Sequence, residues 1–84
     1  MKFLVEVKVV FKNGVRDPQG DVLSLIFSRM KIDDNAKIST GKFFSVLINA
    51  DSPMDAEEKI RTVCAEVLSD PVQEDYEILV VKQV

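Results

Sequence analysis

The strongest restriction on the fold lies in residues 2–12, where every second side chain is apolar and charged residues occupy most of the positions between. The apolar members of this alternation are Phe3, Val5, Val7, Val9 and Phe11. Successive side chains of a strand point to opposite sides of a sheet, so a period of two predicts a β-strand with one buried face. The chain must build a sheet around this segment.

A helix is predicted directly after this strand. Asn13 and Gly14 end the alternation, and Asp17 followed by Pro18 is typical of a helix N-cap with proline in the first turn. Apolar residues then recur at spacings of three and four as far as Lys31, which puts them on one side of a helix. They are Val22, Leu25, Ile26 and Met30, with Leu23 and Phe27 widening the face.

Two short strands and a second helix are predicted next. Residues 37–40 and 42–49 have strand character, and Gly41 between them suits a tight hairpin. The second helix is expected to begin at Pro53, behind the N-cap Ser52. Its predicted apolar face consists of Ala56, Ile60, Val63, Cys64, Val67 and Leu68.

The last strand is predicted at residues 76–81, after Asp70 and Pro71 end the second helix. The order strand, helix, strand, strand, helix, strand is that of the ferredoxin-like, split βαβ arrangement. The predicted fold class is therefore α+β: a βαββαβ sandwich whose four-stranded antiparallel sheet carries both helices on one face. With 84 residues, 46% of them hydrophobic, the chain has room for one domain, 1–84, with one core.

The other face of such a sheet has no helix to cover it. The side chains that alternate with the buried ones face outward there. The large apolar ones are expected to be Leu4, Val10, Phe43, Leu47, Leu79 and Val81. Monomers rarely leave a contiguous apolar patch of this size open, and a chain this short has a small core of its own. We therefore predict a homo-oligomer, a homodimer or tetramer, in which sheet packs on sheet.

Composition excludes several kinds of chemistry. The chain has no histidine and one cysteine, which rules out Ser/His and Cys/His catalysis, the usual zinc ligand sets and an intrachain disulfide. Cys64 falls within the apolar face of the second helix and is interpreted as a packed side chain. No catalytic residue, metal ligand or cofactor site is predicted in this chain.

The charge distribution limits partners and location. Fourteen acidic against eleven basic side chains give a net charge of −3, which offers no electrostatic footprint for nucleic acid or an anionic membrane. Lys2, Glu6 and Lys8 interrupt the apolar run that a signal peptide or membrane helix at the N-terminus would need. We expect a cytoplasmic protein whose partners are proteins or small molecules.

Three segments are distinctive in combination: residues 15–20 (VRDPQG), the Gly41-Lys42 pair, and residues 70–77 (DPVQEDYE). They occur in the order in which the PurS family carries them. The chain resembles this family, the small subunit of phosphoribosylformylglycinamidine (FGAM) synthase, over essentially all of its length.

This resemblance implies an assembly subunit with no active site of its own. In such a complex it bridges a glutaminase subunit and a large amidoligase subunit and supports ammonia transfer between them, as a step of purine biosynthesis. ATP and Mg are then used by the amidoligase subunit. Whether the chain is itself classed as an enzyme stays open, because it is a required subunit of a ligase. The resemblance also suggests partner contacts at Asp17, Gln19, Gly20, Gly41 and Lys42.

Two alternatives stay open. Glycine in the first turn of a helix costs about 1 kcal/mol relative to alanine, so Gly20 calls for a close approach by a partner or by another segment of the same chain. The predicted order of elements also builds ACT-type regulatory domains, which bind amino acids between protomers, so a small-molecule-sensing module is the alternative function.

Overall fold

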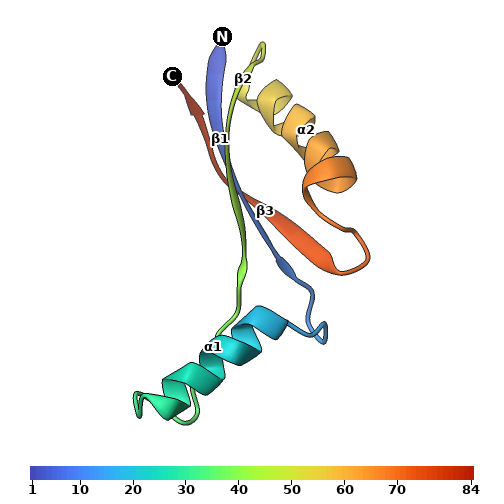
Figure 1. Cartoon of the computed structure of the whole chain (residues 1–84). Helices are drawn as coiled ribbons and strands as arrows, with labels where there is room; N and C mark the ends of the chain where they lie inside the picture. Colours follow the sequence, from blue (N-terminus) through green and yellow to red (C-terminus); the bar gives the residue numbers. More distant parts are fainter.

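A computed structural model describes the whole chain, residues 1–84. The strands are β1 (Lys2–Phe11), β2 (Gly41–Asn49) and β3 (Glu74–Gln83). The helices are α1 (Pro18–Arg29) and α2 (Pro53–Val63), and α2 continues into a π-helical turn, η1 (Cys64–Leu68). The strands form one antiparallel sheet in the order β2-β1-β3, which gives an α+β fold (Figure 1).

The predicted alternation in β1 is confirmed. Its inward side chains are fully buried: Phe3, Val5, Val7 and Val9. They meet the buried face of α2 and η1, which consists of Ala56, Ile60 and Cys64. Partly buried side chains of the flanking strands complete the core: Phe44, Val46, Ile48, Tyr76 and Ile78. The core therefore lies between the sheet and α2.

Both helices begin where their capping residues predict. The Asp17 side chain accepts a hydrogen bond from the Gly20 amide at the start of α1, and the Ser52 side chain accepts one from the Asp55 amide at the start of α2. In each case proline follows the cap directly. Proline suits this position because backbone N–H groups in the first turn have no acceptor within the helix, so its lack of an N–H costs no hydrogen bond.

The strand predicted at residues 37–40 does not form, so the sheet has three strands rather than four. Contacts with α1 occupy this segment instead. The Ile38 amide donates to Ser24 Oγ at 3.0 Å, and the Thr40 amide donates to the Asp17 carboxylate at 2.6 Å. These N–H groups have no capacity left for a strand partner, and the predicted hairpin is absent as well. The four-stranded ferredoxin-like sheet, which also suggested an ACT-type module, is therefore incomplete.

An irregularity between β1 and β3 changes which of the last apolar residues face inward. The pairing shifts between Glu6 and Val7, which leaves Leu79 as an extra residue in β3. An extra residue reverses the alternation beyond it. Val81 packs against the core, whereas Val80 faces outward and is 37% exposed. The predicted outward position of Val81 was wrong, and Val80 takes that place.

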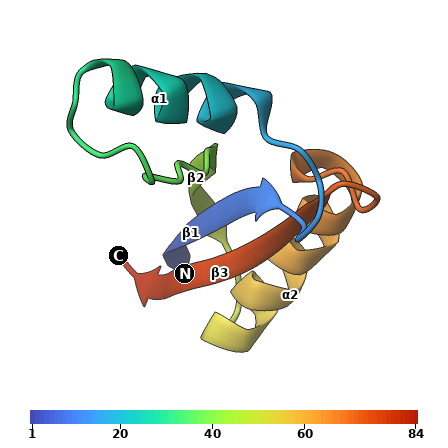
Figure 2. The same cartoon turned by 90° about the horizontal axis from the view of Figure 1, so that it is seen from below.

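The prediction that both helices cover one face of the sheet is wrong for α1. Helix α2 lies against the sheet, whereas α1 projects from one end of it on the opposite side (Figures 1 and 2). Gly20 is the buried residue of α1. Large apolar side chains of this helix and its C-cap residue are between 40% and 65% exposed: Val22, Leu25, Ile26 and Met30.

The molecule is elongated for its length. Its Cα radius of gyration is 16.4 Å, whereas a compact chain of this length has about 12 Å. The accessible surface is 6084 Å², against about 5,000 Å² for a compact monomer of this mass. Each chain thus exposes about 1,000 Å² more than a compact fold of its mass does.

Candidate assembly surface

The first two turns of α1 are fixed to the segment that leads into β2. Asp17 accepts the Gly20 amide at 2.9 Å and both the amide and the hydroxyl of Thr40, at 2.6 and 2.8 Å. One turn further on, the Ser24 hydroxyl donates to the Gly20 carbonyl at 2.9 Å and accepts the Ile38 amide at 3.0 Å. We call these five residues the α1 anchor, because they set the direction in which the helix leaves the sheet.

Hydrogen bonding within the α1 anchor shifts the acidity of its one carboxyl group. The Thr40 amide is the largest cause, followed by the Gly20 amide, and together they hold the pKa of Asp17 below its ordinary value. The shift has this direction because each donor stabilises the ionised carboxylate. Ionised Asp17 is therefore part of what keeps the α1 anchor closed.

Two glycines mark close approaches of backbone within the chain. A Cβ atom on Gly20 would collide with the carbonyl oxygen of Ile38, and one on Gly41 would collide with the carbonyl oxygen of Val9. The close approach that Gly20 calls for is made by a segment of the same chain. A partner subunit is not needed to explain this glycine.

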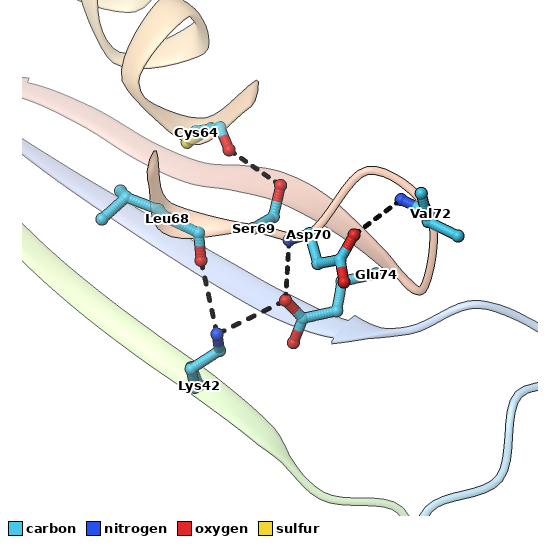
Figure 3. Close-up of polar contacts among 7 residues, drawn as sticks. All are labelled: Lys42, Cys64, Leu68, Ser69, Asp70, Val72 and Glu74. Atoms are coloured by element: carbon cyan, nitrogen blue, oxygen red, sulfur yellow. Dashed lines mark hydrogen bonds and ion pairs between the residues drawn. The ribbon is translucent and has the colours of Figure 1, made fainter. Parts of the chain in front are cut away.

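Lys42 connects the two outer strands of the sheet. It lies opposite Val9 of β1, on the side that carries α2. Its ammonium group is 3.4 Å from the Glu74 carboxylate of β3 and 3.5 Å from the carbonyl oxygen of Leu68 (Figure 3). The same carboxylate accepts the Asp70 amide at 2.8 Å, so Lys42 helps to hold the turn after η1 against the sheet.

Hydrogen bonds between buried residues hold the turn after η1 to the end of that helix. The Ser69 amide and hydroxyl both donate to the Cys64 carbonyl, at 3.0 and 2.7 Å (Figure 3). Burial raises the pKa of the Cys64 thiol, as desolvation disfavours the thiolate. Cys64 and Ser69 therefore belong to the packed end of α2.

The residues expected to contact partner subunits are gathered where α1 meets β2, and most of them already have intramolecular contacts. Asp17 and Gly20 belong to the α1 anchor, Gly41 fits against β1, and Lys42 bridges to β3. Gln19 is exposed on the first turn of α1. Their contact with partner subunits stays a prediction.

The sheet surface opposite α2 is the first large exposed apolar surface, and we call it the open face. Its apolar members are Leu4, Val10, Phe43, Leu47, Leu79 and Val80. Phe43 and Leu47 are 59% and 64% exposed. Lys8 on this face pairs with Glu77 at 3.1 Å, whereas Glu6 in the middle of β1 has no ion-pair partner. The open face is thus mostly apolar, with one unpaired carboxylate.

The second exposed apolar surface is the α1 face, which the sequence pattern assigned to the core. It consists of Val22, Leu25, Ile26, Arg29 and Met30. Periodicity identified its apolar members because it reports the side of a helix on which they lie. It carries no information about what covers that side, so the exposure of this face could not be predicted from it.

No group of three or more Cys, Asp or Glu side chains is arranged to hold a metal ion. Buried side-chain nitrogen and oxygen atoms all have hydrogen-bond partners. Neither helix has the length and the apolar run that crossing a membrane requires.

Comparison with known proteins identifies the family. The family model for PurS, described as phosphoribosylformylglycinamidine (FGAM) synthase, matches residues 4–82. The chain belongs to the PurS family. It is 30% identical over 77 residues to the FGAM synthase subunit PurS of Thermotoga maritima, with 92% of each chain covered. It is 32% identical over 76 residues to subunit PurS of Archaeoglobus fulgidus, with 90% of this chain and 95% of the relative covered.

Solved structures agree with the PurS assignment. A chain in the structure of PurLQS from Thermotoga maritima is 28% identical to this one, with a TM-score of 0.85. The match covers 94% of this chain and 96% of that chain. The PurS resemblance seen in the sequence is therefore confirmed.

Proposed function

We propose that this chain is the non-catalytic assembly subunit of an FGAM synthase in purine biosynthesis. It bridges a glutaminase subunit and an amidoligase subunit so that ammonia released by the first reaches the second. Membership of the PurS family supports this function, as does the similarity to a chain of the PurLQS structure from Thermotoga maritima. In this proposal the amidoligase subunit uses ATP and Mg, and the complex works in the cytoplasm.

The observation that carries this function is the amount of surface left uncovered. An assembly subunit acts by contact, and this chain exposes about 1,000 Å² more than a compact monomer of its mass. Much of the exposed apolar surface lies on the open face and the α1 face, away from the core under α2. Large exposed apolar patches of this kind mark protein interaction sites.

A homo-oligomer is part of the proposal. Packing of the open face against another copy would remove its apolar side chains from water. Five of them are residues predicted for this role: Leu4, Val10, Phe43, Leu47 and Leu79. The sixth is Val80, which takes the place of Val81. Partner subunits are then expected near the junction of α1 and β2, where Gln19 offers a free side chain.

Reconstitution tests the assembly function. The large and glutaminase subunits from the same organism are assayed for glutamine-dependent formation of FGAM, with and without this chain. We expect glutamine-dependent activity to require the chain in stoichiometric amount. Ammonium chloride in place of glutamine is the matched control, because free ammonia needs no transfer between subunits and should support the amidoligase subunit alone. Full glutamine-dependent activity from the two other subunits without this chain would contradict the proposal.

A further inference from the structure

The three asparagines of the chain differ in the residue that follows them. Asn13 is followed by Gly14, whereas Asn35 and Asn49 are each followed by alanine. The backbone nitrogen of the following residue can attack the side-chain amide carbon of an asparagine and close a five-membered ring. A Cβ atom on the following residue crowds this attack, and glycine has none. Asn13 therefore faces the least hindered nucleophile of the three.

The three backbone nitrogens also differ in their hydrogen bonds. The Ala50 N–H donates to the Met1 carbonyl at 2.9 Å, and Ala50 is buried. The Ala36 N–H donates to the Asp33 carbonyl at 3.5 Å. The Gly14 N–H, by contrast, has no acceptor within the chain. A bonded nitrogen must first break its hydrogen bond before it can lose its proton and attack, so the nitrogen of Gly14 is the one free to react.

Asn13 and Gly14 lie in an exposed turn between β1 and α1 (Figure 1). The Val15 N–H closes the turn by donating to the Lys12 carbonyl at 3.1 Å, and Gly14 has a φ of +84°. Apart from its chain neighbours, no residue comes within 4 Å of the place that a Cβ on Gly14 would occupy. The Asn13 side chain is exposed and forms no hydrogen bond within the chain. It is therefore free to turn toward the Gly14 nitrogen, and water reaches both groups.

We propose that Asn13 is a site of spontaneous deamidation, independent of the assembly function proposed above. Hydroxide removes the proton of the Gly14 nitrogen, which forms a bond to Cγ of Asn13. The bond between Cγ and Nδ2 then breaks, and Nδ2 takes up a proton from water and leaves as ammonia. Water opens the resulting succinimide at either of its two carbonyl groups. Opening at Cγ gives aspartate, and opening at the main-chain carbonyl gives isoaspartate, so the overall reaction consumes one water and releases one ammonia.

Both products change the connection that leads from β1 into α1. Either one adds a negative charge at residue 13, in a segment that carries Lys12 and Arg16. Isoaspartate also routes the main chain through its side-chain carbon, which adds one backbone atom between the end of β1 and the Asp17 cap of α1. Its free carboxylate lies in an exposed turn, where an isoaspartyl methyltransferase can reach it. Such an enzyme transfers the methyl group of S-adenosylmethionine to a carboxylate oxygen.

Ageing of the full chain in neutral and mildly alkaline buffer tests the proposal. Anion exchange separates the product by its added charge, and peptide mapping by mass spectrometry locates the change. We expect Asn13 to deamidate about tenfold or more faster than Asn35 and Asn49, because the amides that follow those two residues must first break a hydrogen bond. The rate at Asn13 should rise about tenfold for each pH unit above neutral, since the deprotonated Gly14 nitrogen is the nucleophile. Methylation by a purified isoaspartyl methyltransferase, with labelled S-adenosylmethionine, should report isoaspartate at residue 13.

The control variant is Asn13→Gln, which keeps an exposed amide but would have to close a six-membered ring, a slower reaction. It should gain no charge at residue 13 and carry no methylation there. Ageing in urea is the second control: the rates at Asn35 and Asn49 should rise more than the rate at Asn13, since their hydrogen bonds are lost on unfolding. Three results would overturn the proposal: a rate at Asn13 no higher than at the other two asparagines in the folded chain, equal charge gain in Asn13→Gln and wild type, or an equal acceleration of all three sites by urea.

Discussion

Helices α1 and α2 begin with the same kind of capping sequence, but α2 is covered by the sheet whereas the apolar side of α1 is exposed. Each starts with a capping side chain and a proline, and each has an apolar side. Helix α2 buries that side on the sheet with Ala56 and Ile60, whereas the one buried residue of α1 is Gly20. Capping and amphipathicity determine where a helix forms. What covers the helix is decided by how it is joined to the rest of the chain.

The connections differ between the two helices. Only residues 50–52 separate β2 from α2, so α2 must turn back over the sheet at once. Residues 30–40 separate α1 from β2, and the second half of this segment runs back to the α1 anchor rather than pairing with the sheet. A polar contact therefore holds α1 in place where an apolar contact holds α2. The apolar side of α1 is left for another molecule.

The largest predicted effect compares one isoleucine from each helix. Ile60 of α2 is 2% exposed and Ile26 of α1 is 40% exposed. In dilute solution we expect Ile60→Ala to lower the free energy of unfolding by about 2–5 kcal/mol, because it leaves a cavity in the core. Ile26→Ala should change it by no more than about 0.5 kcal/mol under the same conditions. Urea denaturation followed by circular dichroism measures both.

Protein concentration sharpens this comparison. If α1 is covered by a second copy, the effect of Ile26→Ala on apparent stability should grow as the concentration rises, since association stabilises the folded state by mass action. The effect of Ile60→Ala should change much less. Equal concentration dependence in the two variants would mean that α1 is not at the contact between copies.

The next effect concerns the α1 anchor. Helix propensity alone predicts that Gly20→Ala raises stability by about 1 kcal/mol. The added Cβ collides with the Ile38 carbonyl oxygen, which is backbone and cannot rotate away. We expect the clash to dominate and to lower the stability of the α1 anchor by about 1–3 kcal/mol. Faster hydrogen exchange at the Ile38 and Thr40 amides would report it.

Gln19→Ala is the matched control, because Gln19 is exposed in the same turn of α1. It should leave exchange at the Ile38 and Thr40 amides unchanged. If Gly20→Ala slows exchange at these amides, the close packing of α1 on residues 38–40 is not what requires glycine at this position.

The sequence was sufficient wherever a pattern reports local structure. The alternation in β1 predicted the buried side chains of the central strand, and Asp17 and Ser52 predicted the starts of both helices. Residues 37–40 were predicted as a strand because they are β-prone, but their amides bond to α1. That competition depends on contacts between distant residues, which strand propensity does not describe.

The candidate surfaces show the same limit. The prediction continued the alternation of β3 through Leu79 without interruption. In the structure Leu79 is an extra residue, which reverses the alternation and places Val81 in the core and Val80 on the open face. For Lys42, the sequence could indicate a charged residue beside a glycine but not the Glu74 carboxylate, which comes from the opposite edge strand, β3. One extra residue or one distant partner is enough to change the role of a side chain.

The smallest predicted effect is the pH dependence of the α1 anchor. The pKa of Asp17 is lowered in the folded chain by the Thr40 and Gly20 amides, so ionised Asp17 stabilises the fold above its unfolded pKa of about 3.9, and this contribution is lost as the pH falls through the folded value. Asp17→Asn should therefore be less stable than wild type by a constant amount at neutral pH. Below about pH 4 the difference should shrink, as protonated Asp17 comes to resemble asparagine. Urea denaturation of both proteins at a series of pH values from 7 downward measures this difference in the free energy of unfolding. Other carboxyl groups, such as Asp55, titrate in both proteins alike, and their contributions therefore cancel in the difference. A difference that stayed the same at every pH would show that the charge of Asp17 does not hold α1 in place, and that the hydrogen-bond geometry alone does.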